Sequence, residues 1–105
     1  MKLVEAFTFD DVLIKPDASR VLPNDANTKT NFSKRIKLNI PLVSSAMDTV
    51  TESSMAIEIA KLGGIGVIHR NLDIKKQIFE IKKVKKLKLL VGAAVGAGPN
   101  ELIRA

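Results

Sequence analysis

Residues 40–47 read IPLVSSAM, residues 65–69 read IGVIH and residues 89–95 read LLVGAAV. Each run is short and mostly apolar, which is typical of a strand buried on both faces. Pro41 stands at the start of the first run, where a missing N–H is tolerated. The strand starts, near Leu42, Ile65 and Leu89, are 23 and 24 residues apart. This regular spacing predicts a repeating structural unit.

The segments between these runs have helical spacing. In the first, Thr51 is the predicted N-cap and Gly63-Gly64 the predicted end. In the second, Asp73 is the predicted N-cap. A third helix is predicted to start at Pro99 and to continue through residues 100–105. The apolar positions are Met55, Ala56, Ile59, Ala60 and Leu62 in the first helix and Ile74, Ile78, Ile81 and Val84 in the second.

Buried strands that alternate with amphipathic helices indicate an α/β fold with a parallel sheet. The period fits a (β/α)8 barrel, a fold of about 250 residues. We therefore predict a partial (β/α)8 TIM barrel in which residues 40–105 supply the first three strands. Residues 1–39 contain Pro16 and Pro23 and show no sustained helical periodicity. They are predicted to form an irregular amino-terminal extension of turns and extended segments that wraps the barrel.

The composition of the 105 residues excludes several classes of protein. There is no Cys, which excludes a disulfide scaffold, a thiolate metal site and a cysteine nucleophile within these residues. No apolar run approaches the roughly 20 residues that a membrane-spanning helix needs. Acidic residues interrupt the amino terminus, where a signal peptide would need a continuous apolar stretch. We expect a cytoplasmic domain that handles a cofactor or binds a ligand.

The net charge of +6 is concentrated in one segment. Residues 70–88 hold eight basic and two acidic side chains, and the rest of the chain is balanced. A solvated helix face is the favoured interpretation, because Phe79 is the single aromatic residue in this segment and single-strand binders stack bases on aromatic rings. A basic module that binds RNA or another polyanion through residues 70–88 is the alternative, and nucleic acid is not the expected partner.

Polar side chains follow the predicted strands at the end where parallel α/β folds carry their reactive groups. For Ser45 and Asp48, hydrogen bonding to the loop backbone is as good an interpretation as a functional role. His69 is a lone histidine without a Ser-His-Asp spacing, so a structural role is the more common one. The full set is Ser44, Ser45, Met47, Asp48 and Thr49 after the first strand and His69, Arg70 and Asn71 after the second.

Two further patterns give no ligand site. Gly96-Ala97-Gly98 lies between a strand and a helix, but the third glycine of a dinucleotide fingerprint is replaced by Glu101, so a tight turn is favoured over a phosphate loop. One His, no Cys and scattered carboxylates give no metal-ligand spacing. No metal site is predicted in this chain.

Longer motifs carry a resemblance to a known family. The stretch 44–52 (SSAMDTVTE), followed by Met55-Ala56 and by 63–69 (GGIGVIH), strongly resembles the inosine-5′-monophosphate (IMP) dehydrogenase family. Residues 7–13 (FTFDDVL) and 19–23 (SRVLP) match its amino-terminal signature, and residues 91–96 (VGAAVG) match its third barrel strand. The match covers nearly the whole chain in consistent order. The sister family, guanosine monophosphate reductase, typically differs at the Ser-Ala-Met-Asp-Thr motif and ranks a distant second.

The resemblance implies a homotetrameric enzyme that oxidises IMP to xanthosine monophosphate with NAD⁺, for guanine nucleotide biosynthesis. It also implies a covalent adduct on a loop cysteine and a monovalent cation, K⁺, in the complete enzyme. Ser45 and Met47 look like the nucleotide-contacting pair. Ser19, Val21, Leu22 and Pro23 resemble a surface that meets the NAD adenosine of the neighbouring subunit, although a turn with a buried Val-Leu pair is an equal alternative. Asp48, His69 and Asn71 belong to the barrel mouth without an assigned role.

The sequence departs from the family pattern in three ways. The family's nucleophilic cysteine, cation-binding loop and catalytic flap lie later in the barrel, so no catalytic residue is assigned to this chain. The regulatory CBS modules usually inserted after the second helix are absent, and Lys85-Lys86-Leu87-Lys88 joins the helix to the third strand directly. The third helix is reached only in its first turns. We expect this portion of the enzyme to be inactive alone; a non-catalytic truncated paralogue that joins full-length tetramers is a further alternative.

Overall fold

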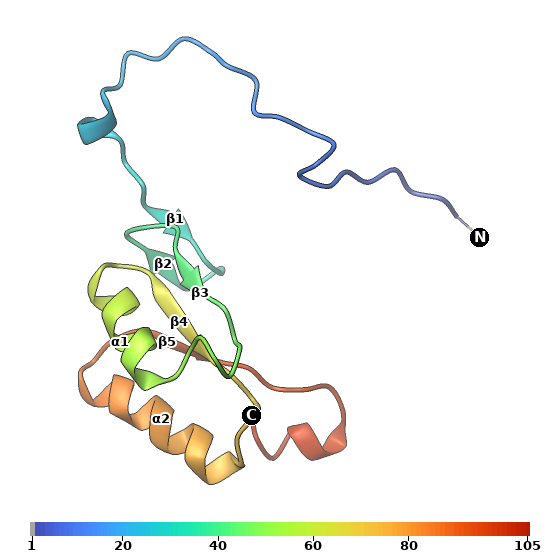
Figure 1. Cartoon of the computed structure of the whole chain (residues 1–105), viewed down its shortest axis with the longest axis vertical. Coiled ribbons are helices and arrows are strands. Elements are labelled where there is room, and N and C mark those ends of the chain that lie inside the picture. The colour runs from blue at the N-terminus through green and yellow to red at the C-terminus, as the bar shows by residue number, and fades with distance from the viewer. Residues whose placement is uncertain (1) are drawn as a thin grey trace.

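The computed structural model describes residues 2–105, except the side chain of Asn100. Figure 1 shows a small α/β unit with a long amino-terminal segment that extends away from it. The elements in chain order are η1 (Pro23–Asp25), β1 (Thr30–Asn31), β2 (Lys37–Leu38), β3 (Val43–Ser44), α1 (Ser53–Lys61), β4 (Ile65–Ile68), α2 (Ile74–Lys86), β5 (Val91–Ala93) and η2 (Pro99–Glu101).

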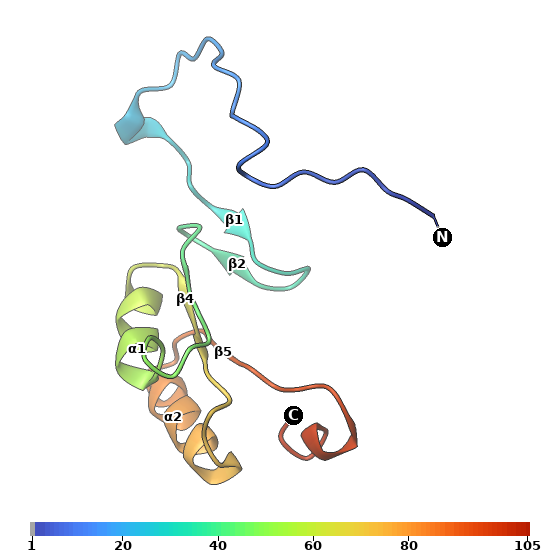
Figure 2. The same cartoon turned by 45° about the vertical axis from the view of Figure 1, so that its right-hand side comes forward.

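The central sheet has the strand order β3-β4-β5, and both pairs are parallel. Ser44 is opposite Gly66 in one pair, and Ile68 is opposite Ala93 in the other. Helices α1 and α2 connect consecutive strands and lie on the same side of the sheet (Figure 2). The predicted parallel sheet with helical connections is confirmed for these three strands.

The core lies between this sheet and the two helices. Ala56, Ile68 and Val84 are fully buried there, and several partly buried side chains pack against them. Gly66 makes the packing possible, because a Cβ at this position would lie 2.5 Å from the Cα of Ala56. The close approach of β4 to α1 therefore requires glycine in the strand. The partly buried side chains are Ile57, Leu72, Ile81, Leu89 and Val91.

The start of α1 differs from the prediction. Glu52, not Thr51, occupies the N-cap position, and its side chain makes no capping hydrogen bond. The side chain of Thr51 is buried and donates its hydroxyl hydrogen bond to the carbonyl oxygen of Ser45. The backbone N–H of Ser53 instead donates to the carboxylate of Glu80 on α2, at 2.9 Å. A carboxylate from the neighbouring helix thus replaces the predicted local cap.

The electrostatics of Glu80 follow from this contact. Burial raises the pKa of its carboxyl group, but hydrogen bonds from Lys83 and Ser53 outweigh burial and lower the pKa to about 2. The Lys83 Nζ lies 2.6 Å from Glu80 Oε1. Glu80 is therefore held as a carboxylate between the two helices.

Helix α2 confirms its prediction more closely. Asp73 is the N-cap, and its side chain accepts a hydrogen bond from the N–H of Lys76 at 2.9 Å. At the other end, Lys88 has a φ of 59°, a left-handed conformation that stops the helix. The N–H of Lys88 donates to the carbonyl of Lys85 at 2.8 Å. Four residues, 87–90, then connect α2 to β5.

Two strands and the third helix are shorter than predicted. The predicted strands 40–47 and 89–95 pair only over Val43–Ser44 and Val91–Ala93. The first is short because the loop after β3 folds back on itself. The predicted third helix is one 3₁₀ turn, Pro99–Glu101, preceded by Gly98 at a φ of 121°. The carboxylate of Glu101 accepts a hydrogen bond from the N–H of Gly96, which turns this segment back toward the β5 loop.

The amino-terminal segment, residues 2–29, is exposed at every position. It leads into an antiparallel hairpin of β1 and β2, which the irregular pattern of residues 1–39 did not predict. The hairpin is attached to the unit through the N–H of Asn39, which donates to the carbonyl of Gly63 at 2.9 Å. That residues 1–39 wrap a barrel stays a prediction. Among the described residues, no helix is both long enough and apolar enough to cross a membrane.

Candidate functional site

The loop between β3 and α1 carries the predicted nucleotide-contacting pair. Ser45 and Met47 are both exposed, immediately after the carboxyl end of β3. The N–H of Met47 donates to the carbonyl of Ser45 at 2.9 Å, and the N–H of Thr51 donates to the carbonyl of Met47 at 3.0 Å. These hydrogen bonds make the loop compact while its two candidate side chains face solvent.

Asp48 connects this loop to its neighbour. Its Oδ2 accepts a hydrogen bond from Asn71 Nδ2 at 2.8 Å, and both side chains are exposed. The interpretation that Asp48 bonds to loop backbone is therefore replaced by a side-chain contact between two loops. Parallel strands place the loops after β3 and β4 at the same edge of the sheet, which brings these residues together.

His69 lies beneath the same edge. The side chain is buried, and its Nε2 lies 3.3 Å from Oε1 of Glu52. Its Nδ1 is buried and has no hydrogen-bond partner among the described residues. The partner is thus a carboxylate and not a nucleophilic hydroxyl, so the geometry does not assemble a Ser-His-Asp triad.

Gln77 is a residue that sequence reasoning missed. It is buried on α2, and its Nε2 donates to the carbonyls of His69 at 3.1 Å and Ala94 at 2.9 Å. Arg104 Nη1 donates to Gln77 Oε1 at 3.0 Å and to the carbonyl of Leu72 at 2.9 Å. This network joins the carboxyl ends of β4 and β5. Its signal in the sequence is a polar residue on the apolar face of α2, between Ile74 and Ile81.

The loop after β5 behaves as a turn. The N–H of Gly96 donates to Glu101 Oε2 at 3.0 Å, and Arg104 Nε lies 3.2 Å from the same oxygen. The hydrogen bond from Gly96 is the largest cause that lowers the pKa of Glu101. The N–H of Gly96, which a phosphate-binding loop would offer to a phosphate, thus already donates to a carboxylate. This supports the tight-turn interpretation.

The predicted NAD-contacting residues lie elsewhere. Ser19, Val21, Leu22 and Pro23 are exposed in the amino-terminal segment, away from β3 (Figure 1). Ser19 Oγ accepts a hydrogen bond from the N–H of Val21 at 3.1 Å, so this stretch is a turn. Val21 and Leu22 are 60% and 68% exposed, so they do not form a buried pair among the described residues. The structure does not bring this group to Ser45 and Met47.

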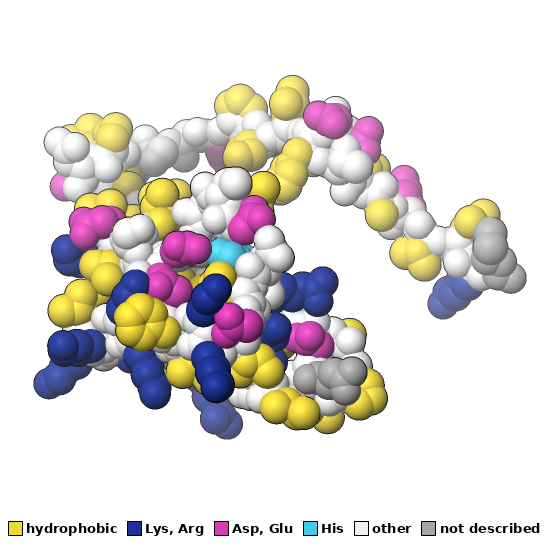
Figure 3. Space-filling model, turned by 60° about the horizontal axis from the view of Figure 1, so that its bottom comes forward, with side chains coloured by type: hydrophobic (Ala, Val, Ile, Leu, Met, Phe, Trp, Pro, Cys, Tyr) yellow, Lys and Arg dark blue, Asp and Glu magenta, His cyan; other side chains and the backbone are white. Residues whose placement is uncertain are grey.

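The lysine side chains of α2 are exposed (Figure 3). Two of them are paired within the helix, Lys76 with Asp73 at 3.7 Å and Lys83 with Glu80. Lys83 Nζ also lies 4.5 Å from the ring centroid of Phe79. This arrangement is that of a solvated helix face; polyanion binding by residues 70–88 stays a prediction.

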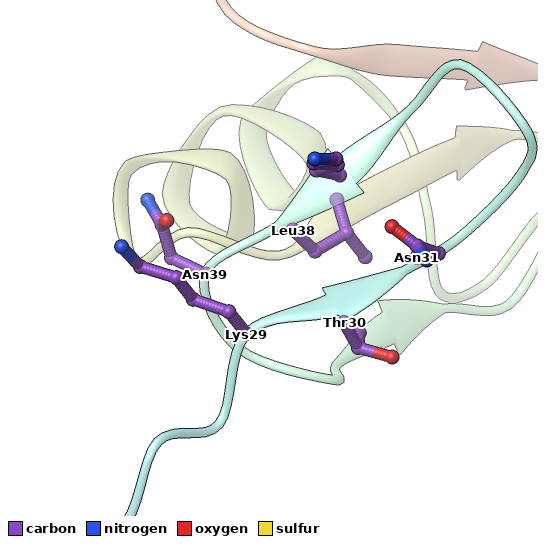
Figure 4. A pocket seen from close by; sticks show the side chains of 6 residues that line it. Lys29, Thr30, Asn31, Leu38 and Asn39 are labelled. Carbon is purple, nitrogen blue, oxygen red and sulfur yellow. The ribbon is translucent and has the colours of Figure 1, made fainter.

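A hollow of about 380 Å³ lies beside the β1–β2 hairpin (Figure 4). Because Asn39 bonds to Gly63, just before β4, this hollow is at the amino ends of the strands. It is thus at the opposite edge of the sheet from Ser45 and was not predicted. Its lining residues are Lys29, Thr30, Asn31, Lys37, Leu38 and Asn39.

The parallel βαβαβ unit, with polar side chains gathered in the loops after its strands, defines an α/β domain of the kind that binds ligands at the carboxyl ends of strands. Residues 6–105 match the family described as "IMP dehydrogenase / GMP reductase domain". The chain belongs to this family, and the resemblance predicted from the motifs is confirmed.

Curated relatives support the same assignment. Inosine-5′-monophosphate dehydrogenase of Aquifex aeolicus is 61% identical over 85 residues, which cover 81% of this chain and 17% of the relative. The enzyme of the same name from Borreliella burgdorferi is 61% identical over 97 residues, 92% of this chain and 24% of the relative. The enzyme of the same name from Methanocaldococcus jannaschii is 47% identical over 106 residues, which cover 97% of this chain and 21% of the relative. The chain spans about a fifth of the length of these relatives.

Proposed function

We propose that these residues are the amino-terminal portion of an IMP dehydrogenase, which oxidises IMP to xanthosine monophosphate with NAD⁺ in the cytoplasm. The single observation that carries the proposal is the place of the SSAMDTVTE stretch. It begins at Ser44, the last residue of β3, and continues into the loop at the carboxyl ends of the parallel strands, in a chain up to 61% identical to enzymes of that name. The three strands are proposed to be the first of a (β/α)8 barrel.

Ser45 and Met47 are proposed to contact IMP. Both side chains are exposed, and the hydroxyl of Ser45 has no protein partner among the described residues. A hydroxyl suits a phosphate or sugar oxygen, and a thioether suits the face of a purine. The hydrogen bonds within the loop hold both residues at one edge.

Ser19, Val21, Leu22 and Pro23 are proposed to meet the adenosine of NAD bound to a neighbouring subunit of a homotetramer. The residues fit this group chemically, because Val21 and Leu22 expose an apolar surface and Ser19 keeps its hydroxyl proton available for donation. NAD⁺, when bound, accepts the hydride from IMP. The proposal assigns no residue of this chain to the monovalent cation.

The covalent step is proposed to need a cysteine, and none is present in the 105 residues. The role of this portion is therefore to bind and orient the nucleotide, not to react with it. We expect no turnover from the 105-residue polypeptide alone.

The test is an assay of NAD⁺ reduction with IMP. The full-length protein that carries these residues is compared with the 105-residue polypeptide and with a Ser45→Ala variant of the full-length protein. We expect turnover only in the full-length forms, with KM for IMP raised about fivefold in the variant through loss of one hydrogen bond. Absence of IMP-dependent turnover in the full-length protein would overturn the proposal.

A further inference from the structure

The loop that carries Ser45 and Met47 is closed by hydrogen bonds between its own residues. Besides the hydrogen bonds at Ser45 and Thr51, the N–H of Val50 donates to the carbonyl of Met47 at 3.0 Å. The buried hydroxyl of Thr51 donates to the carbonyl of Ser45 from the inner side. Because these hydrogen bonds couple the residues of the loop, a contact made by one of them affects the position of the others.

The loop after β4 is anchored independently. The carbonyl of Ile68 accepts a hydrogen bond from the N–H of Ala94 at 2.9 Å. The carbonyl of His69 accepts another from the buried amide of Gln77. Asn71 follows two residues later, so its side chain extends from a segment fixed to both β5 and α2.

The side chains of Asp48 and Asn71 connect these two loops. They are 23 positions apart in sequence, and their 2.8 Å hydrogen bond joins the loop that presents the candidate nucleotide contacts to the anchored one. The amide also fixes where the negative charge of Asp48 lies, one residue from Met47. Because a carboxylate and a phosphate repel each other more strongly at shorter distance, the position of this charge affects the binding of a nucleotide monophosphate.

We propose that Asn71 is a positioning residue for IMP, which acts through Asp48 to hold the loop of Ser45 and Met47 in its binding geometry. The inference rests on the proposed function and adds to it a residue outside the contact pair. A neutral amide that donates to a carboxylate is the chemistry required, since the bond is stronger when its acceptor is charged.

An exchange of the two side chains tests this directly in the full-length protein. Asn71→Asp places two carboxylates at the 2.8 Å contact, and we expect KM for IMP to rise about tenfold or more with kcat changed less than about twofold. Asp48→Asn combined with Asn71→Asp restores one donor and one carboxylate with their places exchanged. We expect this double variant to recover KM to within about threefold of the wild type.

The pH profile separates positioning from simple loss of structure. Two adjacent carboxylates share a proton at lower pH, so the defect of Asn71→Asp should shrink as the pH falls, whereas the exchanged double variant should show no such dependence. Asn31→Ala, an exposed asparagine on the hairpin at the other edge of the sheet, is the matched control and should leave KM and kcat unchanged.

Three results would contradict the positioning role of Asn71. If the wild type oxidises IMP and the exchanged variant is as poor as Asn71→Asp, or if Asn71→Asp matches the wild type, Asn71 does not position the loop. A loss confined to kcat would also overturn the role. If the wild type does not oxidise IMP, the proposed function fails first and this inference falls with it.

Discussion

The amino-terminal segment and the β3–β5 unit contain similar apolar side chains but place them in opposite environments. Phe9 and Ile14 are 97% and 96% exposed, whereas Ile65 and Ile68 are 1% and 0% exposed. The apolar residues of the unit recur at strand and helix spacing, and those of the segment do not. Spacing, and not apolar content, therefore decides which residues form a core within this chain.

The largest difference between the two regions is expected in the free energy of unfolding when an isoleucine of each is replaced by alanine. Ile68→Ala removes a fully buried side chain and should lower the free energy of unfolding of the β3–β5 unit by about 2–5 kcal/mol, through lost burial and the cavity left behind. Ile14→Ala, at an exposed position, should change it by less than about 0.5 kcal/mol. Amide hydrogen exchange of β4 and α1 in the full-length protein measures both. Equal effects would mean that the contrast in burial has no energetic meaning.

An intermediate effect is expected from Glu80, the partly buried carboxylate between the helices. Because the folded-state pKa of Glu80 is lowered from 4.5 to about 2, the carboxylate stabilises the fold above about pH 4.5 and loses this contribution as the pH falls toward 2. Glu80→Gln should destabilise the unit at neutral pH by on the order of 2 kcal/mol, and the difference from the wild type should vanish near pH 2. Hydrogen exchange of α1 at a series of pH values tests this.

A matched control for Glu80 lies in the exposed segment. The carboxylate of Asp11 accepts hydrogen bonds from the N–H and hydroxyl of Thr8, at 2.9 and 3.3 Å. Asp11→Asn should leave the exchange of α1 unchanged at every pH. A difference between wild type and Glu80→Gln that persisted unchanged through pH 2 would contradict the assigned role of the carboxylate.

The smallest effect is expected at the N-cap of α2. Asp73→Ala removes the hydrogen bond to the N–H of Lys76 and should cost about 1 kcal/mol, whereas Asp73→Asn should cost little because asparagine caps nearly as well. Hydrogen exchange of the first turn of α2 reports both. If Asp73→Ala destabilises the helix no more than Asp73→Asn, the capping hydrogen bond does not contribute to the stability of α2.

The parts of the fold that the sequence predicted are those set by local spacing. The three strands, their parallel arrangement and helices α1 and α2 all follow from apolar periodicity, and Asp73 caps α2 as its position indicates. The predicted cap, Thr51, was wrong because its hydroxyl donates to the carbonyl of Ser45. Glu80 instead accepts from the N–H of Ser53, 27 positions away in the sequence. Contacts over such separations depend on packing and leave no periodic signal.

The same distinction applies to the candidate site. Topology predicted that Ser45, Asp48 and Asn71 would gather at one edge, and the 2.8 Å contact between Asp48 and Asn71 confirms this for the last two. The network of Gln77 and Arg104 was missed, because a polar residue on an apolar helix face does not reveal its partner. The roles of Ser45, Met47 and Ser19 toward nucleotides stay predictions, since no ligand contact tests them.

The short connection between α2 and β5 has an architectural consequence. Lys88 ends the helix locally through its left-handed conformation, and residues 87–90 enter β5 at the amino end of the strand. Ser45 and Asn71 follow the carboxyl ends of β3 and β4, at the opposite ends of the strands. Extra residues inserted at 87–90 are therefore expected to leave the strand order and the loops that carry Ser45 and Asn71 unchanged.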